Sequence, residues 1–274
     1  MEARLLHIFR NTPEGRETLL QSIHFCKVMD AAPLVYIPRF VKFLMYFEND
    51  VVQIDLDDSY LASPETAADR IEAMMAEHGL EVAFLVPKNF TSATLPDIPS
   101  DVDFMTCPRS ISDFSAKIGL GFVGPRVRRL VRSARFPVLV TGPACRPWTS
   151  IAVFFGGSVN AFKALRLGIR IHRKTGMPLR LFTRTEGREP EYYRQAVTDR
   201  RLDRELSACG AEWHFLEEGR DGEDFEDLPH DALIVLGLSG HSLIHDLLFG
   251  SFMERVQAKL ENPLLIVGPG YAAG

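Results

Sequence analysis

An internal repeat that relates the two halves of the chain limits its possible folds more than any other feature. The segment FPVLVTGP at residues 136–143 is similar to NPLLIVGP at residues 262–269. Gly124 and Gly250 each stand thirteen residues before the first proline of these segments. At the front of each half, LLHIF at residues 5–9 matches IAVFF at residues 151–155. A repeat this long indicates a duplicated domain, so we expect domains at residues 1–143 and 149–274.

Apolar runs and amphipathic stretches alternate within each half. In the second half we expect strands at residues 151–155, 179–183, 212–216, 232–237 and 264–268, and helices at residues 160–174, 189–209 and 252–260. Alternation of this kind predicts an α/β fold with a parallel sheet that is covered by helices on both faces. Ligands on such sheets bind at the carboxyl ends of the strands, where the strand order reverses.

A glycine pattern, G-x2-G-x9-G-S, follows the strand expected at residues 232–237. Its members are Gly237, Gly240, Gly250 and Ser251. Glycine lets backbone N–H groups approach an anion without a Cβ in the way, and a helix that begins at Ser251 directs its free N–H groups to the same place. The pattern therefore predicts a site for a phosphate chain. The structural alternative is that Gly237 ends a strand and that SFME at residues 251–254 is a capping box.

These residues resemble the universal stress protein family. The resemblance covers nearly all of the second half, and in the first half it covers the first strand, the first helix and the last helix-strand unit. The chain is thus similar to a tandem member. The resemblance implies two Rossmann-like domains, each with a five-stranded parallel sheet of order 3-2-1-4-5 and helices on both faces. It also implies that the domains pair through their last strands, at residues 138–141 and 264–267.

The resemblance further implies an adenine nucleotide, ATP or AMP with or without Mg²⁺, in the second half. Gly237 and Gly240 would surround the ribose and phosphates, and Gly250 and Ser251 would donate hydrogen bonds to the phosphates. The adenine would lie near two further residues, Gly156 and Thr183.

Two positions depart from the family pattern. Family members usually carry an aspartate after the first strand, where this chain has Gly156. The loss of one hydrogen bond there lowers affinity by up to about tenfold. In the first half, Pro125 stands in place of the phosphate-binding serine and removes both a hydroxyl and an N–H donor. We therefore expect a degenerate site in the first half and an intact one in the second.

The composition restricts the partners and the compartment. A net charge of −5 gives no general attraction to nucleic acid, and the apolar runs are too short for a membrane helix. The N-terminus lacks a signal sequence, and the four cysteines form no C-x-x-C pair. We expect a cytoplasmic protein that binds a nucleotide and serves as a sensor or regulator in a stress response. The sequence does not decide whether two chains also form a homodimer in addition to the pairing of the two domains.

We expect no enzyme, because no base for activating water is evident beside the glycine pattern. One alternative is an adenine-nucleotide hydrolase-like enzyme that acts at the α-phosphate. Such enzymes carry an S-G-G-x-D-S loop, and FGGSVN at residues 155–160 keeps its glycines but lacks its aspartate. The other alternative is a protein-interaction module without a nucleotide.

Three other features have structural and functional interpretations. The apolar residues 40–47 predict a buried packing segment. His241 and His245 are four residues apart, without an evident third metal ligand. An amphipathic helix carries five arginines whose expected place is a solvated face, with an anion or acidic-partner patch as the alternative. These arginines are Arg126, Arg128, Arg129, Arg132 and Arg135.

Overall fold

The computed structural model describes residues 2–48, 50–109, 111, 123–185, 187–216, 228–238 and 261–272. The strands of its large sheet are β1 (Ala3–Ile8), β2 (Ala31–Tyr36), β5 (Ala83–Leu85), β8 (Phe104–Pro108), β9 (Val138–Thr141), β10 (Ser150–Phe154), β11 (Leu179–Arg184), β12 (Glu212–Leu216), β13 (Ala232–Gly237) and β14 (Leu264–Val267). A second sheet contains β3 (Lys42–Phe47), β4 (Asp50–Asp55), β6 (Phe90–Ser92) and β7 (Leu95–Ile98).

The helices that the structure describes are α1 (Pro13–Met29), α2 (Pro64–Glu77), α3 (Pro125–Ser133), α4 (Val159–Thr175), α5 (Pro190–Asp199) and α6 (Asp203–Ala208), together with the short 3-10 helix η1 (Asp58–Tyr60). The expected helix over residues 189–209 is wrong, because it is two helices. Arg201 lies between them with a φ of 57°, and this left-handed conformation interrupts the helical hydrogen bonds. None of the described helices is long and apolar enough to cross a membrane.

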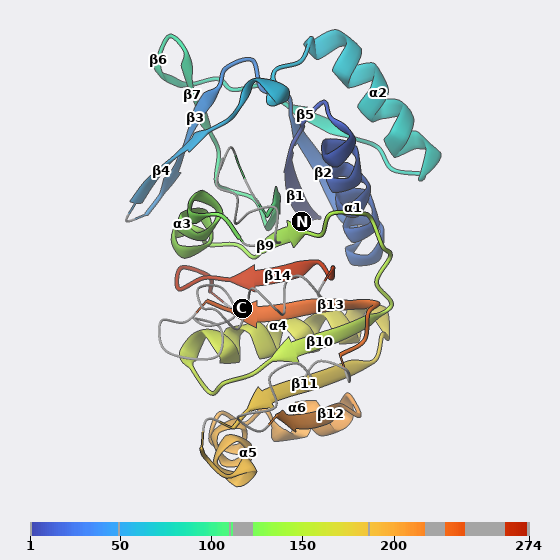
Figure 1. The fold of residues 1–274 in the computed structure, drawn as a ribbon, viewed down its shortest axis with the longest axis vertical. Helices are drawn as coiled ribbons and strands as arrows, with labels where there is room; N and C mark the ends of the chain where they lie inside the picture. The colour runs from blue at the N-terminus through green and yellow to red at the C-terminus, as the bar shows by residue number, and fades with distance from the viewer. Residues whose placement is uncertain are drawn as a thin grey trace.

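The large sheet has the strand order β12-β11-β10-β13-β14-β9-β8-β1-β2-β5 and runs along the molecule (Figure 1). The five strands from β12 to β14 have the order 3-2-1-4-5, and so do the five from β5 to β9. Neighbours within each group are parallel. The α/β fold that the sequence predicts, with this strand order, is confirmed.

The two groups of strands meet at β9 and β14, which pair antiparallel. Leu139 lies opposite Leu265, and Val138 lies opposite Ile266. Just beyond β14, a Cβ on Gly268 would lie 1.9 Å from the carbonyl oxygen of Val131 in α3. Only glycine permits so close an approach of two backbones. The last strand of the second half is therefore packed against both the last strand and the last helix of the first.

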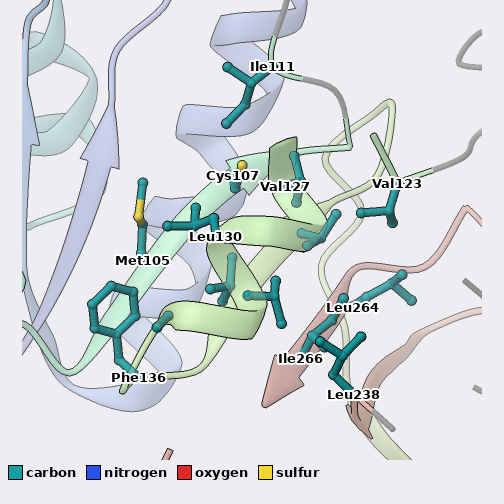
Figure 2. Close-up of a cluster of buried hydrophobic side chains, with 14 of the residues drawn as sticks. Met105, Cys107, Ile111, Val123, Val127, Leu130, Phe136, Leu238, Leu264 and Ile266 are labelled. Carbon is teal, nitrogen blue, oxygen red and sulfur yellow. The ribbon is translucent and has the colours of Figure 1, made fainter. Parts of the chain in front are cut away.

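Successive residues of the central strands face opposite sides of the sheet, as strand geometry requires. On one side, α3 packs against the sheet, and Figure 2 shows its Val127 and Leu130 between Met105 of β8 and Ile266 of β14. On the other side, α1, α4, α5 and α6 cover a second core. Both cores contain residues from both halves of the chain.

The first half contains the additional four-stranded sheet, of order β4-β3-β7-β6. In Figure 1 this sheet lies at the end of the molecule away from α5. The apolar segment expected to pack forms β3 within it. Phe43 and Met45 are fully buried, while Tyr46 is 45% exposed. The expected packing role is thus confirmed for the inward side chains.

Candidate nucleotide site

The carboxyl ends of β10 and β13 bring together three of the six predicted site residues. Phe154 of β10 pairs with Leu236 of β13, so Gly156 and Gly237 follow at the same edge of the sheet. Thr183 lies on β11, next to β10. The other three predicted residues, Gly240, Gly250 and Ser251, lie outside the described residues, as do His241 and His245.

Gly237 brings the end of β13 against the first turn of α4. A Cβ at this position would lie 2.2 Å from the carbonyl oxygen of Asn160 and 2.7 Å from the nitrogen of Ala161. The side-chain amide of Asn160 donates a hydrogen bond to the carbonyl oxygen of Leu238, directly after the strand. Glycine is thus required here for packing, independently of any ligand. Sequence reasoning missed Asn160, whose only signal is its place beside the glycine-serine turn.

The N-terminus of α4 lies at the same edge of the sheet and is capped by a serine side chain. Ser158 is the N-cap, and its hydroxyl oxygen accepts a hydrogen bond of 3.2 Å from the N–H of Ala161. Gly157 precedes it with a φ of 75°, in the left-handed region that favours glycine. The free N–H groups and the positive dipole end of a helix favour an anion at such a place. The N-terminus of α4 therefore favours an anion at this edge.

Thr183 lies inside the core and exposes no surface. Its hydroxyl donates a hydrogen bond of 2.7 Å to the carbonyl oxygen of Phe155 and accepts one of 2.9 Å from the indole N–H of Trp213. Both hydrogen-bonding roles of the hydroxyl are therefore filled within the protein. Thr183 fixes the end of β10 and leaves no free polar atom for a base.

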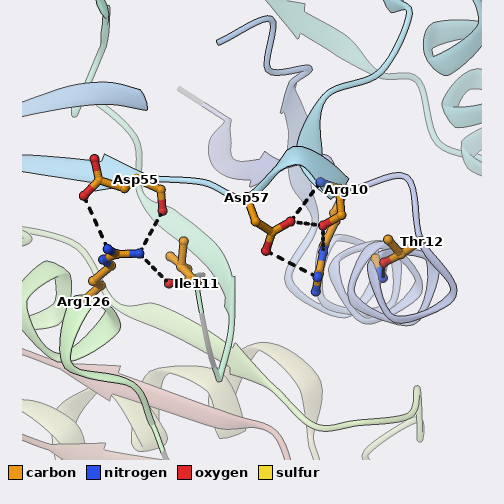
Figure 3. Close-up of polar contacts among 8 residues, drawn as sticks. Arg10, Thr12, Asp55, Asp57, Ile111 and Arg126 are labelled. Carbon is orange, nitrogen blue, oxygen red and sulfur yellow. Dashed lines mark hydrogen bonds and ion pairs between the residues drawn. The ribbon is translucent and has the colours of Figure 1, made fainter. Parts of the chain in front are cut away.

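The equivalent edge of the first half is filled by the protein's own side chains (Figure 3). Thr12 caps α1 as Ser158 caps α4, so Arg10 stands where the second half has Gly156. The Nε of Arg10 donates a hydrogen bond of 2.7 Å to Ser59 Oγ, and its Nη2 lies 3.6 Å from Asp57 Oδ2. An arginine and an inserted turn thus occupy this edge.

The strand register also places Pro108 opposite Gly237, because Pro108 pairs with Thr141 as Gly237 pairs with Val267. Proline has no N–H to donate, so the first half lacks this donor as well as the one replaced by Pro125.

Two arginines of α3, and Arg135 just after it, contact acidic residues of the hairpin formed by β3 and β4. Arg126 lies 3.5 Å from Asp55 Oδ2 and donates a hydrogen bond of 3.3 Å to the backbone carbonyl of the same residue (Figure 3). Arg129 lies 3.4 Å from Asp50, and Arg135 pairs with Glu48. Arg129 and Arg135 remain exposed, as expected for a solvated face, while Arg126 is partly buried against Asp55. Their acidic partners belong to the same chain.

The comparisons with known proteins concern the fold. No protein-family model and no curated protein matches the sequence. A universal stress protein from Archaeoglobus fulgidus DSM 4304 is 16% identical, with 97% of each chain covered and a TM-score of 0.63. A putative universal stress protein from Pseudomonas aeruginosa UCBPP-PA14 is 14% identical, with 98% of this chain and 94% of that chain covered and a TM-score of 0.57.

A third solved structure is the cytoplasmic domain of a prokaryotic cation chloride cotransporter. It is 12% identical, with 100% of this chain and 98% of that chain covered and a TM-score of 0.52. At these identities the likeness concerns the fold alone. The chain has the fold of universal stress proteins along nearly its whole length.

Proposed function

We propose that this chain is a tandem universal stress protein that binds one adenine nucleotide, ATP or AMP, in its second half. The observation that carries the proposal is the close approach of Gly237 to the first turn of α4, which follows the Gly-Gly-Ser turn at the carboxyl ends of β10 and β13. Strand order reverses between these two strands, which is where ligands bind on sheets of this type. The glycine pattern continues from the same point in the sequence, through Gly240, Gly250 and Ser251.

The two halves form two domains in this proposal, at residues 1–143 and 149–274. The repeated strand order and the antiparallel pairing of β9 with β14 support it. Residues 144–148 connect the halves, and the N–H of Cys145 donates a hydrogen bond of 2.8 Å to Glu17. The edge of β14, which a second chain would otherwise cover, is thus covered from within the same chain.

The expected stoichiometry is one nucleotide per chain. In the first half, Arg10 and its partners fill the edge where the second half has Gly156. Pro108 and Pro125 remove two backbone donors from the same region. These differences support a structural role for the first half, in which it pairs with the nucleotide-binding half and binds no nucleotide itself.

Calorimetric titration of the full chain with ATP and with AMP tests the site. We expect one site per chain, which Gly250→Val removes because a branched side chain blocks the backbone donors. The matched control is Gly124→Val, at the equivalent glycine of the first half, which should leave nucleotide binding unchanged in a folded protein. Two sites per chain, or binding that survives Gly250→Val, would contradict the proposal.

We propose a regulatory or sensor role in the cytoplasm and little or no hydrolysis of ATP. The turn after β10 reads FGGSVN and lacks the aspartate of hydrolase-like enzymes. The four cysteines form no disulfide, which suits a reducing compartment. Incubation with magnesium-ATP and a phosphate assay tests the absence of turnover. A rate on the order of 1 s⁻¹ would favour the enzyme alternative.

Binding of neither nucleotide would favour the protein-interaction module. Mass spectrometry of ligand released from the purified protein distinguishes a nucleotide-binding protein from a nucleotide-free module. It does not depend on the choice of titrant, because a bound nucleotide is identified by its mass. Recovery of an adenine nucleotide from the wild type but not from Gly250→Val would support the proposal directly.

A further inference from the structure

The first half contains a cavity of about 350 Å³ that is separate from the predicted nucleotide site. It lies at the carboxyl ends of β2 and β5, beside the first turn of α2 and next to β6 and β7. All of its lining residues belong to the first half. Seven of them are aromatic residues and prolines, namely Tyr36, Phe40, Phe84, Phe90, Pro64, Pro87 and Pro96.

The cavity opens to solvent through an apolar rim. Val86 is 73% exposed and Phe90 is 47% exposed, and both line the cavity. Phe40 and Phe90 meet edge to face across a centroid distance of 6.2 Å. Aromatic rings arranged this way offer both faces and edges to a third ring. A pocket with apolar walls and few polar groups is the usual form of a small-molecule site.

Two polar groups in the cavity lack partners. Tyr36 is only 2% exposed, yet its hydroxyl makes no hydrogen bond with the described residues. Arg39 is exposed, and its guanidinium forms neither a hydrogen bond nor an ion pair with them. The Tyr36 hydroxyl can therefore donate a hydrogen bond to a ligand in this largely apolar cavity, where such a bond is electrostatically stronger than in water.

The charges around Tyr36 indicate which ligand would be stabilised. Burial raises the pKa of Tyr36 to about 12, so its hydroxyl is a neutral donor at neutral pH. The positive charge of Arg39, which lines the same cavity, opposes this rise in the pKa of Tyr36. Glu65 stands at the rim, and its carboxylate accepts a hydrogen bond of 2.9 Å from Ser63. Because Glu65 adds a negative charge at the same rim, a ligand with a single negative charge is favoured over a dianion.

We propose that this cavity binds a small aromatic carboxylate. Its ring would pack among Phe40, Phe84 and Phe90, and its carboxylate would accept hydrogen bonds from Arg39 and Tyr36. At about 30 Å³ for each water molecule, the cavity has room for about a dozen waters. A bicyclic aromatic acid occupies less volume than these waters, so the cavity has room for it.

The test uses 2-naphthoate as the probe and its neutral analogue, 2-naphthalenemethanol, as the matched ligand control. Each is titrated into the full-length protein by calorimetry. We expect one naphthoate site of millimolar affinity or tighter, and binding of the neutral analogue about tenfold weaker or more, because a charge-assisted hydrogen bond is lost. Saturation with ATP should leave naphthoate binding unchanged, since the two sites are in different halves.

Two variants test the polar contacts. Arg39→Gln should weaken naphthoate binding about tenfold or more and leave the neutral analogue unaffected, while Tyr36→Phe should weaken naphthoate binding about three- to tenfold. Arg132→Gln, at an exposed arginine of α3, is the control. Naphthoate binding that is absent at millimolar concentration, equal to that of the analogue, displaced by ATP, or unchanged in both variants would overturn the proposal.

Discussion

His7 makes the folded state sensitive to acid. Its side chain lies between β1 and α1, only 1% exposed, with Nδ1 2.9 Å from Ser22 Oγ. Its other nitrogen, Nε2, has no hydrogen-bond partner in the described residues. Burial lowers the pKa of His7 from 6.5 to about 3, because the charged ring would be desolvated. The native ring is therefore neutral over the whole range in which an unfolded chain would take up a proton.

The sign of the effect follows from this difference. Below about pH 6.5 the unfolded chain binds a proton that the native state does not, so the free energy of unfolding falls as the pH falls from about 6.5 toward about 3. At about 1.36 kcal/mol for each pH unit, the loss between about pH 7.5 and about pH 5 is about 2 kcal/mol. This value requires only that the native pKa of His7 is well below 5.

The perturbation is His7→Leu, which keeps an apolar side chain in the core and removes the titrating ring. Ser22 still has a partner, because its hydroxyl donates a hydrogen bond of 3.1 Å to the carbonyl oxygen of Thr18. Urea unfolding at the two pH values measures the change for each protein. The wild type should lose about 2 kcal/mol more than His7→Leu on acidification.

Because both proteins carry the same other titrating groups, the difference between the wild type and His7→Leu isolates the contribution of His7. Burial also lowers the pKa of His24, which contributes in the same direction to both proteins. His230 is exposed, so His230→Gln is the matched control and should follow the wild type. Parallel stability curves for the wild type and His7→Leu would refute the reasoning. They would mean that His7 is not held neutral by burial.

Three further predictions concern packing and assembly. Gly268→Ala should lower the free energy of unfolding by about 1–3 kcal/mol, because the new Cβ would lie 1.9 Å from Val131 O; an unchanged melting temperature would contradict this. Residues 149–274 alone should dimerise or aggregate through the bare edge of β14, and a stable monomer in light scattering would contradict the pairing surface. Arg129→Gln should cost less than about 1 kcal/mol, a difference that shrinks in about 1 M salt, because its pair with Asp50 is solvent-exposed.

Much of the fold is readable from the sequence because it depends on local periodicity and on the repeat. The strands expected at residues 212–216 and 232–237 have the observed bounds. The matching segments at residues 136–143 and 262–269 contain β9 and β14, the last strands of the two halves. Ser158 caps α4 beside the glycine turn, as its place between a strand and a helical pattern suggests. Each of these features requires only residues that are close together in the chain.

The tertiary structure decided the features that depend on distant contacts. The helical pattern of residues 189–209 continues through Arg201, but the chain turns there and buries Leu202. The partner of Arg129 is Asp50, on an inserted hairpin far away in the sequence. Thr183 looks like a strand-end ligand, and only its bonds to Phe155 and Trp213 show that it belongs to the core.

The cavity near Tyr36 also depends on contacts between segments that are distant in the chain. Its walls come from β2, α2, β5, β6 and β7, which span most of the first half of the chain. Periodicity in a sequence reports which face of an element is apolar, because it reflects burial of one side of a helix or strand. The partner of a charge and the shape of a cavity are set by which elements meet in space. Here β6 and β7 of the additional sheet lie against β2 and β5 of the repeated unit.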